Sequence, residues 1–318
     1  MTPTAAPDSP RHGDLRAQLD TLTTEAFRSD LAEIDRLPTL EIAGLMNGED
    51  ATVPAAVAEQ LPSIAAVIDG TAERMARGGR LIYAGAGTAG RLGVLDASEC
   101  PPTFNTRPGE VVGLIAGGPS AMINSIEGAE DSKELAAADL DALGLTADDT
   151  VVGVSASGRT PYAIGAVEHA RALGALTAGL SCNAGSALGA AAEHAIEVVV
   201  GPEMLTGSTR LKAGTAQKLV LNMLSTITMI RLGKTYGNLM VDVRASNEKL
   251  RARSRRIVAL ATGASDDEIE AALSATGGEV KDAILAILGG VDGPAAVRLL
   301  AGSRGHLRAA LRAAAEQG

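Results

Sequence analysis

The 318-residue sequence has almost no aromatic side chains, with no Trp, three Tyr and two Phe. Stacking of nucleic-acid bases on aromatic rings is therefore excluded as a binding mode. Positive charge is also scarce, because 28 Lys and Arg stand against 38 Asp and Glu, which gives a formal net charge of -10. Such a chain repels nucleic acid and anionic membranes. We expect its partners to be a small molecule and further copies of itself, with no nucleic acid and no membrane.

Cysteine and long apolar runs are scarce as well. Cys100 and Cys182 lack CxxC or Cys/His spacing, and the four histidines are scattered, so neither a disulfide framework nor a metal site is predicted. We expect both thiols to lie in the core. The first twenty residues contain no apolar signal segment, and no run reaches the roughly 18 apolar residues of a membrane span. These absences predict a soluble, cytoplasmic protein.

Hydrophobic residues make up 46% of the chain, and 37 glycines accompany them, which predicts a sizeable aliphatic core with many tight turns. Five short apolar runs, beginning near residues 80, 110, 150, 175 and 195, alternate with segments of helix length. Runs that are apolar on both faces and separated by long crossovers indicate a parallel sheet covered by helices on both sides. The fold class predicted from this pattern is α/β.

The regions around these runs suggest four parts. We predict a disordered tail over residues 1–25, N-terminal helices over 26–69, the sheet domain over 70–235 and a small helical subdomain over 236–318. The sheet domain is expected to end with a long helix from about Thr209 to Leu232. In the subdomain, the segment SDDEIEAAL at 265 is typical of a capping box.

Two Gly- and Ser-rich loops follow the first and third runs, at the strand ends where open α/β sheets bind ligands. The loop GAGTAGR at 85–91 enters a predicted helix, whose free N–H groups attract anions. It also fits GxGxxG, but no ribose-binding acid follows, and a plain strand-helix turn is the alternative. The loop SASGRTP at 155–161 offers the hydroxyls of Ser155, Ser157 and Thr160, either to a phosphate or as helix caps. Together, the two loops favour a phosphate-binding site at this edge of the sheet.

Carboxylates suited to acid–base chemistry are Glu99, in DASEC, and Glu127 and Glu130, in EGAED. Glu99 stands among apolar residues, where burial would raise its pKa. Glu127 and Glu130 are three residues apart, so we predict that they face one side of a helix and that at least one points at the pocket. Two carboxylates in different environments can supply one general acid and one general base. The alternative for each glutamate is that it is an ordinary solvent-exposed surface residue without a catalytic role.

The segment TGSTRLKAGTAQK at 206–218 places Ser208, Thr209, Arg210 and Lys212 at another predicted helix start. Such a group can form a cationic clamp for a carboxylate or a phosphate. Ordinary capping with solvated charges explains the same residues equally well.

These motifs together resemble one family. The blocks GRLIYAGAGTAGRLGVLDASECPPTF, IEGAEDS, VVGVSASGRTPY and TGSTRLKAGTAQKLVLNMLST are similar to those of bacterial N-acetylmuramic acid 6-phosphate etherases, and the resemblance covers roughly residues 25–300. It implies a sugar isomerase (SIS) domain, with a flavodoxin-like five-stranded parallel sheet between helices. It also implies C-terminal helices similar to ubiquitin-associated modules, a homodimer with sites near its interface, and no cofactor.

The implied activity is that of a carbon–oxygen lyase in cell-wall amino sugar recycling. It cleaves the D-lactyl ether of N-acetylmuramic acid 6-phosphate by syn elimination and water addition, giving N-acetylglucosamine 6-phosphate and D-lactate. By motif position, Glu99 matches the proton donor to the departing lactate, and Glu130 matches the second active-site acid, the expected C2 base. Glu127 is the less favoured partner.

The resemblance also assigns phosphate binding to Thr88, Ser155, Ser157 and Thr160. From the loops and the predicted helix start themselves, we expect further substrate contacts at Gly87, Gly90, Gly158, Ser208, Arg210 and Lys212. The family usually reads GTSGR, whereas this chain has Ala89 in place of the serine, which removes one candidate hydroxyl. Two alternatives stay open: a non-catalytic phosphosugar-binding SIS regulator, which needs no acids, and a sugar phosphate isomerase, which needs no acid at the C3 ether oxygen.

Overall fold

The computed structural model describes residues 22–124, 126–243 and 248–316, so most of the predicted tail lies outside the described residues. Residues 22–25 differ from the prediction, because they form a 3-10 turn, η1 (Thr23–Glu25), in which Thr24 is fully buried. The amide oxygen of Asn183 accepts hydrogen bonds from the N–H and the hydroxyl of Thr23, both at 2.9 Å. Its amide nitrogen donates to the Thr24 hydroxyl at 3.2 Å. This anchor orders a segment that local composition predicts to be a tail.

The five predicted apolar runs are the five strands of one parallel sheet. They are β1 (Leu81–Gly85), β2 (Val111–Ile115), β3 (Thr150–Val154), β4 (Leu176–Ser181) and β5 (His194–Glu197). The strand order is β2-β1-β3-β4-β5, and every neighbouring pair is parallel. This is the flavodoxin-like order, and it confirms the predicted architecture. The chain reverses its direction of travel across the sheet between β1 and β3, which is where such folds bind ligands.

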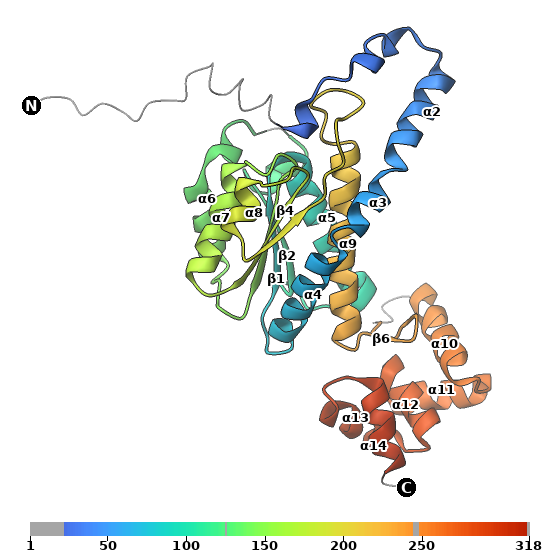
Figure 1. Cartoon of the computed structure of the whole chain (residues 1–318). Coiled ribbons are helices and arrows are strands. Elements are labelled where there is room, and N and C mark those ends of the chain that lie inside the picture. Colours follow the sequence, from blue (N-terminus) through green and yellow to red (C-terminus); the bar gives the residue numbers. More distant parts are fainter. Residues whose placement is uncertain (1–21, 125, 244–247, 317–318) are drawn as a thin grey trace, which may run out of the picture.

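Helices cover both faces of the sheet (Figure 1). One face carries α6 (Lys133–Ala142), α7 (Pro161–Ala172) and α8 (Ala187–Ala191), and the other carries α4 (Leu61–Met75), α5 (Gly87–Phe104) and α9 (Lys212–Arg231). Leu81 and Tyr83 of β1 pack into the core under α4, α5 and α9. Ile82 and Ala84 pack into the core under α6 and α7. Successive side chains point to opposite faces of a strand, which is why these runs are apolar throughout.

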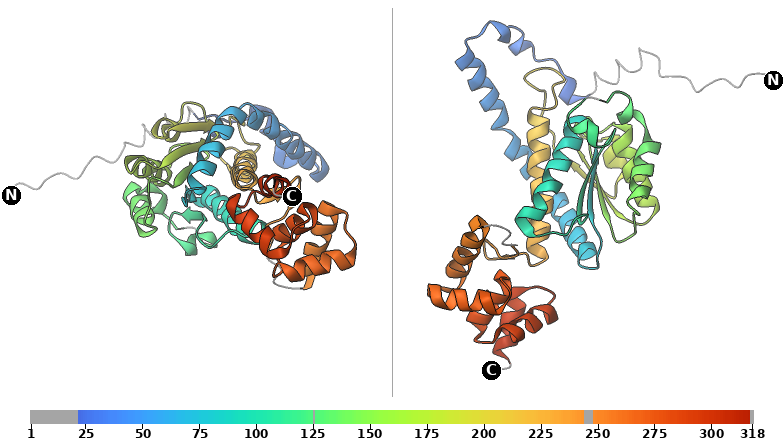
Figure 2. Two further views of the ribbon diagram at one scale, coloured as in Figure 1. Left: turned by 90° about the horizontal axis from the view of Figure 1, so that it is seen from below. Right: turned by 180° about the vertical axis from the view of Figure 1, so that it is seen from behind.

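The N-terminal region leads into this domain through short elements. They are η2 (Ser29–Leu31), η3 (Ile34–Arg36), α2 (Thr39–Asp50) and α3 (Val53–Ala58). The apolar residues from Val53 to Met75 are divided between α3 and α4, and Pro62 stands in the first turn of α4, where its missing N–H costs no helical hydrogen bond. α2 projects from the domain as an arm and has no buried residue (Figures 1 and 2).

The C-terminal helices form a second core at the end of the molecule opposite the arm (Figures 1 and 2). The hairpin β6 (Thr235–Tyr236) and β7 (Leu239–Met240) leads to α10 (Glu248–Thr262), α11 (Asp266–Ala275), α12 (Val280–Gly289), α13 (Gly293–Gly302) and α14 (Leu307–Ala315). The predicted capping box is confirmed, since Ser265 caps α11 and the Glu268 carboxylate accepts from the Ser265 N–H at 2.8 Å. Over the described ranges, no single helix is long and apolar enough to cross a membrane.

The two cysteines are free and buried, as the sequence predicts. Cys100 is 2% exposed and Cys182 is fully enclosed. Burial raises the pKa of each thiol to about 12, so neither is a thiolate near neutral pH. Both therefore act as small core side chains.

Candidate active site

A cavity of about 770 Å³ lies at the carboxyl ends of β1 and β3, where the chain reverses across the sheet. We call it the main cavity. Its lining comes from η1, the loop after β1, the segment before α6, the loop after β3 and the start of α9. The polar residues among its lining are Glu25, Thr88, Glu130, Asp131, Ser155, Ser157, Arg159, Thr160, Thr209 and Gln217. The structure thus brings all four predicted phosphate ligands to one place.

The loop after β3 gathers its hydroxyls tightly. Ser155 Oγ lies 2.8 Å from Thr160 Oγ1 and 3.3 Å from Ser157 Oγ. Gly158 adopts a left-handed φ of 69°, which is costly for other residues, and its N–H donates to Ser155 Oγ at 3.1 Å. Pro161 then starts α7 at a position that needs no N–H donor. Three hydroxyls held this way can donate to the oxygens of a phosphate monoester.

The loop after β1 brings the start of α5 to the same cavity. The residue before the helix is Ala86, whose methyl side chain cannot cap it, so the first N–H groups are available to an anion. Gly87, Thr88 and Ala89 line the cavity. Gly90 and Gly158 are not part of the lining. Gly90 instead permits close packing, because a Cβ there would lie 2.7 Å from the Gly85 carbonyl oxygen.

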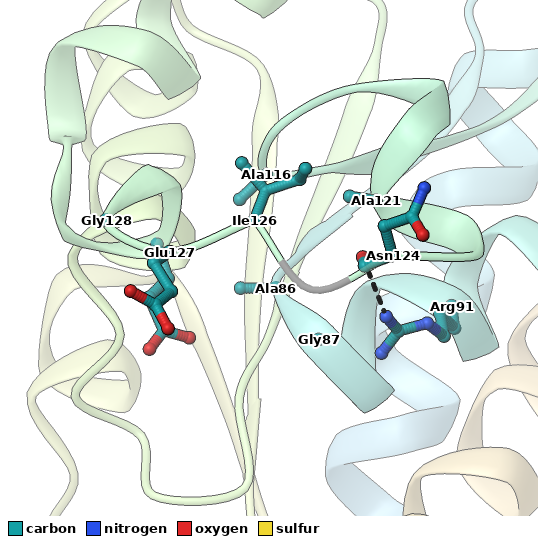
Figure 3. Close-up of a pocket in the computed structure, with 10 residues that line it drawn as sticks. Ala86, Gly87, Arg91, Ala116, Ala121, Asn124, Ile126, Glu127 and Gly128 are labelled. Carbon is teal, nitrogen blue, oxygen red and sulfur yellow. Dashed lines mark hydrogen bonds between the residues drawn. The ribbon is translucent and has the colours of Figure 1, made fainter.

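Glu130 lines the main cavity, whereas the predicted helix around it is wrong. Glu127 lies in a turn and Glu130 in the 3-10 turn η5 (Ala129–Asp131), because Gly128 between them has a φ of 76° that interrupts any helix. Both carboxylates nevertheless line one adjoining pocket of about 200 Å³, which we call the side pocket (Figure 3). Glu130 belongs to both spaces and therefore stands where they meet.

Glu99 lies elsewhere. The helix α5 advances twelve residues from Gly87 to Glu99, which is about 18 Å at 1.5 Å per residue. Glu99 is exposed, contrary to the predicted burial, and it lines a separate cavity of about 540 Å³ beside Asn222 and Ile230 of α9. One chain therefore does not bring Glu99 and Glu130 together.

The buried carboxylate of the DASEC motif is Asp96. It accepts hydrogen bonds from Tyr83 Oη at 2.9 Å, Asn222 Nδ2 at 2.7 Å and Ser225 Oγ at 3.1 Å. Burial raises the pKa of Asp96, and these three donors act against that rise. Because Asn222 and Ser225 belong to α9, this network fastens α5 to α9.

The predicted clamp before α9 is not formed, since Ser208, Arg210 and Lys212 are all absent from the cavity lining. Lys212 is buried, and its Nζ lies 2.5 Å from a carboxylate oxygen of Glu49. The first N–H groups of α9 are also engaged, because the Glu203 carboxylate accepts from Lys212 N and Ala213 N at 3.0 Å each. Arg210 is exposed. The segment contributes Thr209 to the cavity and serves otherwise to fasten the start of α9.

Sequence reasoning missed several lining residues. Arg159 stands inside the recognised hydroxyl loop, whereas Glu25 comes from the predicted tail. Gln217 is 1% exposed, and its Nε2 has no hydrogen-bond partner among the described residues. Buried polar atoms without a partner are uncommon in folded proteins, and Gln217 belongs to the lining of the main cavity. Its sequence signal is weak, because Ser225 and Thr228 of α9 are polar and buried as well.

Comparisons with known proteins agree with this fold. A glucokinase regulatory protein N-terminal SIS domain model matches residues 63–171, and a SIS domain model matches residues 129–227. The sheet order, the hydroxyl loop and these matches define a SIS-domain protein. A phosphoheptose isomerase structure from Francisella tularensis is 20% identical with a TM-score of 0.46, covering 61% of this chain and 100% of that one.

Relatives with much higher identity are known. The N-acetylmuramic acid 6-phosphate etherase of Streptomyces coelicolor is 84% identical over 306 residues, covering 96% of this chain and 98% of that protein. The etherase of Rubrobacter xylanophilus is 63% identical over 294 residues, covering 92% and 97%. The chain therefore belongs to the N-acetylmuramic acid 6-phosphate etherases, as the sequence motifs predict.

Proposed function

We propose that the main cavity binds N-acetylmuramic acid 6-phosphate and that the chain cleaves its D-lactyl ether, giving N-acetylglucosamine 6-phosphate and D-lactate. The supporting observation is that Glu130 shares the main cavity with Ser155, Ser157 and Thr160. A sugar held by its phosphate at these hydroxyls extends toward a carboxylate. A protein that only binds phosphosugars has no need of that carboxylate, which favours an enzyme in amino sugar recycling.

The reaction is an elimination followed by an addition. With the sugar ring open, the C1 aldehyde acidifies the C2 proton, which the Glu130 carboxylate removes. The electron pair of the C2–H bond forms a C2=C3 double bond as the C3–O bond breaks. A protonated carboxyl gives its proton to the ether oxygen, and D-lactate leaves. Water then adds at C3 and a proton returns to C2, so that one water is consumed in each cycle.

Release of D-lactate from N-acetylmuramic acid 6-phosphate tests this function. A general base contributes about 10²- to 10⁴-fold, so Glu130→Gln is expected to lose activity on that scale. Glu134→Gln is the matched control, because Glu134 lies in the first turn of α6 and lines neither space. Wild-type activity that survives unchanged in Glu130→Gln would exclude Glu130 as the base.

We propose further that the protein is a homodimer in which Glu99 of one copy serves the main cavity of the other. Glu99 is exposed in the single chain, and Leu95, one turn earlier on α5, is 52% exposed. Ile230 beside the Glu99 cavity is 46% exposed. A carboxylate next to exposed apolar side chains is typical of a surface that is buried in a protein interface. In a twofold-symmetric dimer, each copy would supply Glu99 to the site of the other, so both sites would be complete.

Mixing of two inactive variants tests this arrangement. If each site takes Glu99 from one copy and Glu130 from the other, a heterodimer of Glu99→Gln and Glu130→Gln contains one intact site. Random reassociation makes half of the dimers mixed, so about a quarter of the wild-type activity should return. If both variants are dimeric and exchange subunits without any recovery, Glu99 does not act across the dimer.

We also propose a cytoplasmic location. Cys100 and Cys182 are both free thiols, which suits a reducing compartment. Fractionation of cells that express the tagged chain would test this, and recovery outside the cytoplasmic fraction would contradict it.

A further inference from the structure

Figure 3 shows residues that line the side pocket, and Glu130 belongs both to this lining and to that of the main cavity. Ala86, Gly87 and Glu130 line both spaces, so a ligand in the main cavity can extend past Glu130 into the side pocket. Its volume is about 200 Å³, whereas one water occupies about 30 Å³ of liquid. It therefore has room for a three-carbon acid attached to a sugar.

We propose that the side pocket receives the lactyl group of the substrate and that Arg91 binds the lactyl carboxylate. This assignment rests on the proposed function and names the part of the substrate that the pocket recognises.

Arg91 is held in place by backbone carbonyls. Its Nε donates to the Met122 carbonyl oxygen at 3.0 Å, and its Nη2 lies 3.4 Å from that of Asn124. Both acceptors belong to the segment around η4 (Pro119–Met122), which follows β2. A guanidinium has five N–H donors, so further donors remain after these two contacts.

Among the described residues, Arg91 has no carboxylate as its counter-charge. Within residues 22–124, 126–243 and 248–316, no Asp or Glu oxygen lies within 4.0 Å of its guanidinium. An oriented cation without an ion-pair partner in a pocket wall suits an anionic ligand, and a guanidinium can bind a carboxylate through two parallel hydrogen bonds.

The rest of the pocket orients such a group. Glu127 lies on the opposite side from Arg91 (Figure 3), so charge repulsion directs a ligand carboxylate toward Arg91. Ala116, Ala121 and Ile126 supply apolar surface that suits the lactyl methyl. With the carboxylate at Arg91 and the sugar in the main cavity, the ether bond falls beside Glu130. The pocket would thereby distinguish an etherase substrate from a phosphosugar without a lactyl group.

The test compares the substrate with its own product. Arg91→Gln and Arg91→Lys are assayed for kcat and KM on N-acetylmuramic acid 6-phosphate, and for inhibition by N-acetylglucosamine 6-phosphate and by D-lactate. Loss of a charged hydrogen bond is expected to lower kcat/KM by about 10- to 100-fold in Arg91→Gln, mainly through KM. Arg91→Lys should recover part of the loss. Inhibition by the sugar phosphate, which lacks the lactyl group, should stay within about twofold, whereas inhibition by D-lactate should disappear.

Arg107→Gln is the control, because the Arg107 side chain is 82% exposed and lies outside both spaces. Retained inhibition by N-acetylglucosamine 6-phosphate shows that the Arg91 variants still fold. An unchanged KM in both variants would overturn the inference. The inference would also be overturned if both Arg91 variants bound the substrate and N-acetylglucosamine 6-phosphate more weakly by the same factor. Arg91 would then bind the part that the two ligands share. A wild-type protein that releases no D-lactate would instead contradict the proposed function.

Discussion

The hydroxyl oxygens of Ser155 and Thr160 lie 2.8 Å apart in the wall of the main cavity. Each can turn its proton toward a phosphate oxygen, and a hydrogen bond to a charged group contributes about 1.5–3 kcal/mol. Ser155→Ala is therefore expected to raise KM for the phosphosugar about 10- to 100-fold. Steady-state kinetics measures this, with Ser303→Ala in the C-terminal subdomain as control. A KM equal to that of the control would show that the phosphate binds elsewhere.

A substitution at Ala89 is expected to lower KM, whereas the Ser155 substitution raises it. Its side chain lines the main cavity, where the family usually places a serine hydroxyl. Ala89→Ser should lower KM by about 2- to 10-fold, which corresponds to one added hydrogen bond. Ala89 is only 6% exposed, so the melting temperature should be measured alongside. An unchanged KM in a stably folded variant would show that this position does not face the phosphate.

Substitution of Gln217 should weaken substrate binding without lowering the stability of the fold. Its Nε2 is buried without a hydrogen-bond partner in the part of the chain that the structure describes. Gln217→Leu removes this unsatisfied donor at similar volume, so the free energy of unfolding should be unchanged or higher. KM should nevertheless rise about 5- to 10-fold because a donor to the substrate is lost. A variant with lower stability and an unchanged KM would make Gln217 a structural residue.

The pair formed by Lys212 and Glu49 predicts a dependence on pH. Hydrogen bonds from Lys212 and then Arg28 lower the pKa of Glu49 below its ordinary value of 4.5. A carboxyl whose folded pKa is lowered stabilises the fold above its unfolded pKa, and this contribution is lost as the pH falls through the folded pKa. Lys212→Met should therefore cost about 1–3 kcal/mol at pH 7 and clearly less near pH 3. Urea unfolding of both proteins at the two pH values measures the difference, and an equal loss at both would contradict the ionic origin.

The sheet and the gathering of the two loops at one cavity could be predicted because their signals are local. Runs apolar on both faces identify buried parallel strands, and loops that follow neighbouring parallel strands lie at the same edge of the sheet. Two of the misassigned residues depend on distant partners. Thr23 is held by a hydrogen bond to Asn183, 160 positions away. Lys212 binds the carboxylate of Glu49, 163 positions away, and does not line the cavity. In the proposed dimer, the environment of Glu99 depends on a second chain, which local apolar neighbours do not reveal.

The proposed function depends on removal of the C2 proton of N-acetylmuramic acid 6-phosphate by Glu130 in the main cavity. Its most direct test is reaction in deuterated water, with NMR of both products. We expect the wild-type protein to form D-lactate and N-acetylglucosamine 6-phosphate that carries deuterium at C2, and Glu130→Gln should form neither product. D-lactate release with the original proton retained at C2, or undiminished deuteration by Glu130→Gln, would contradict it.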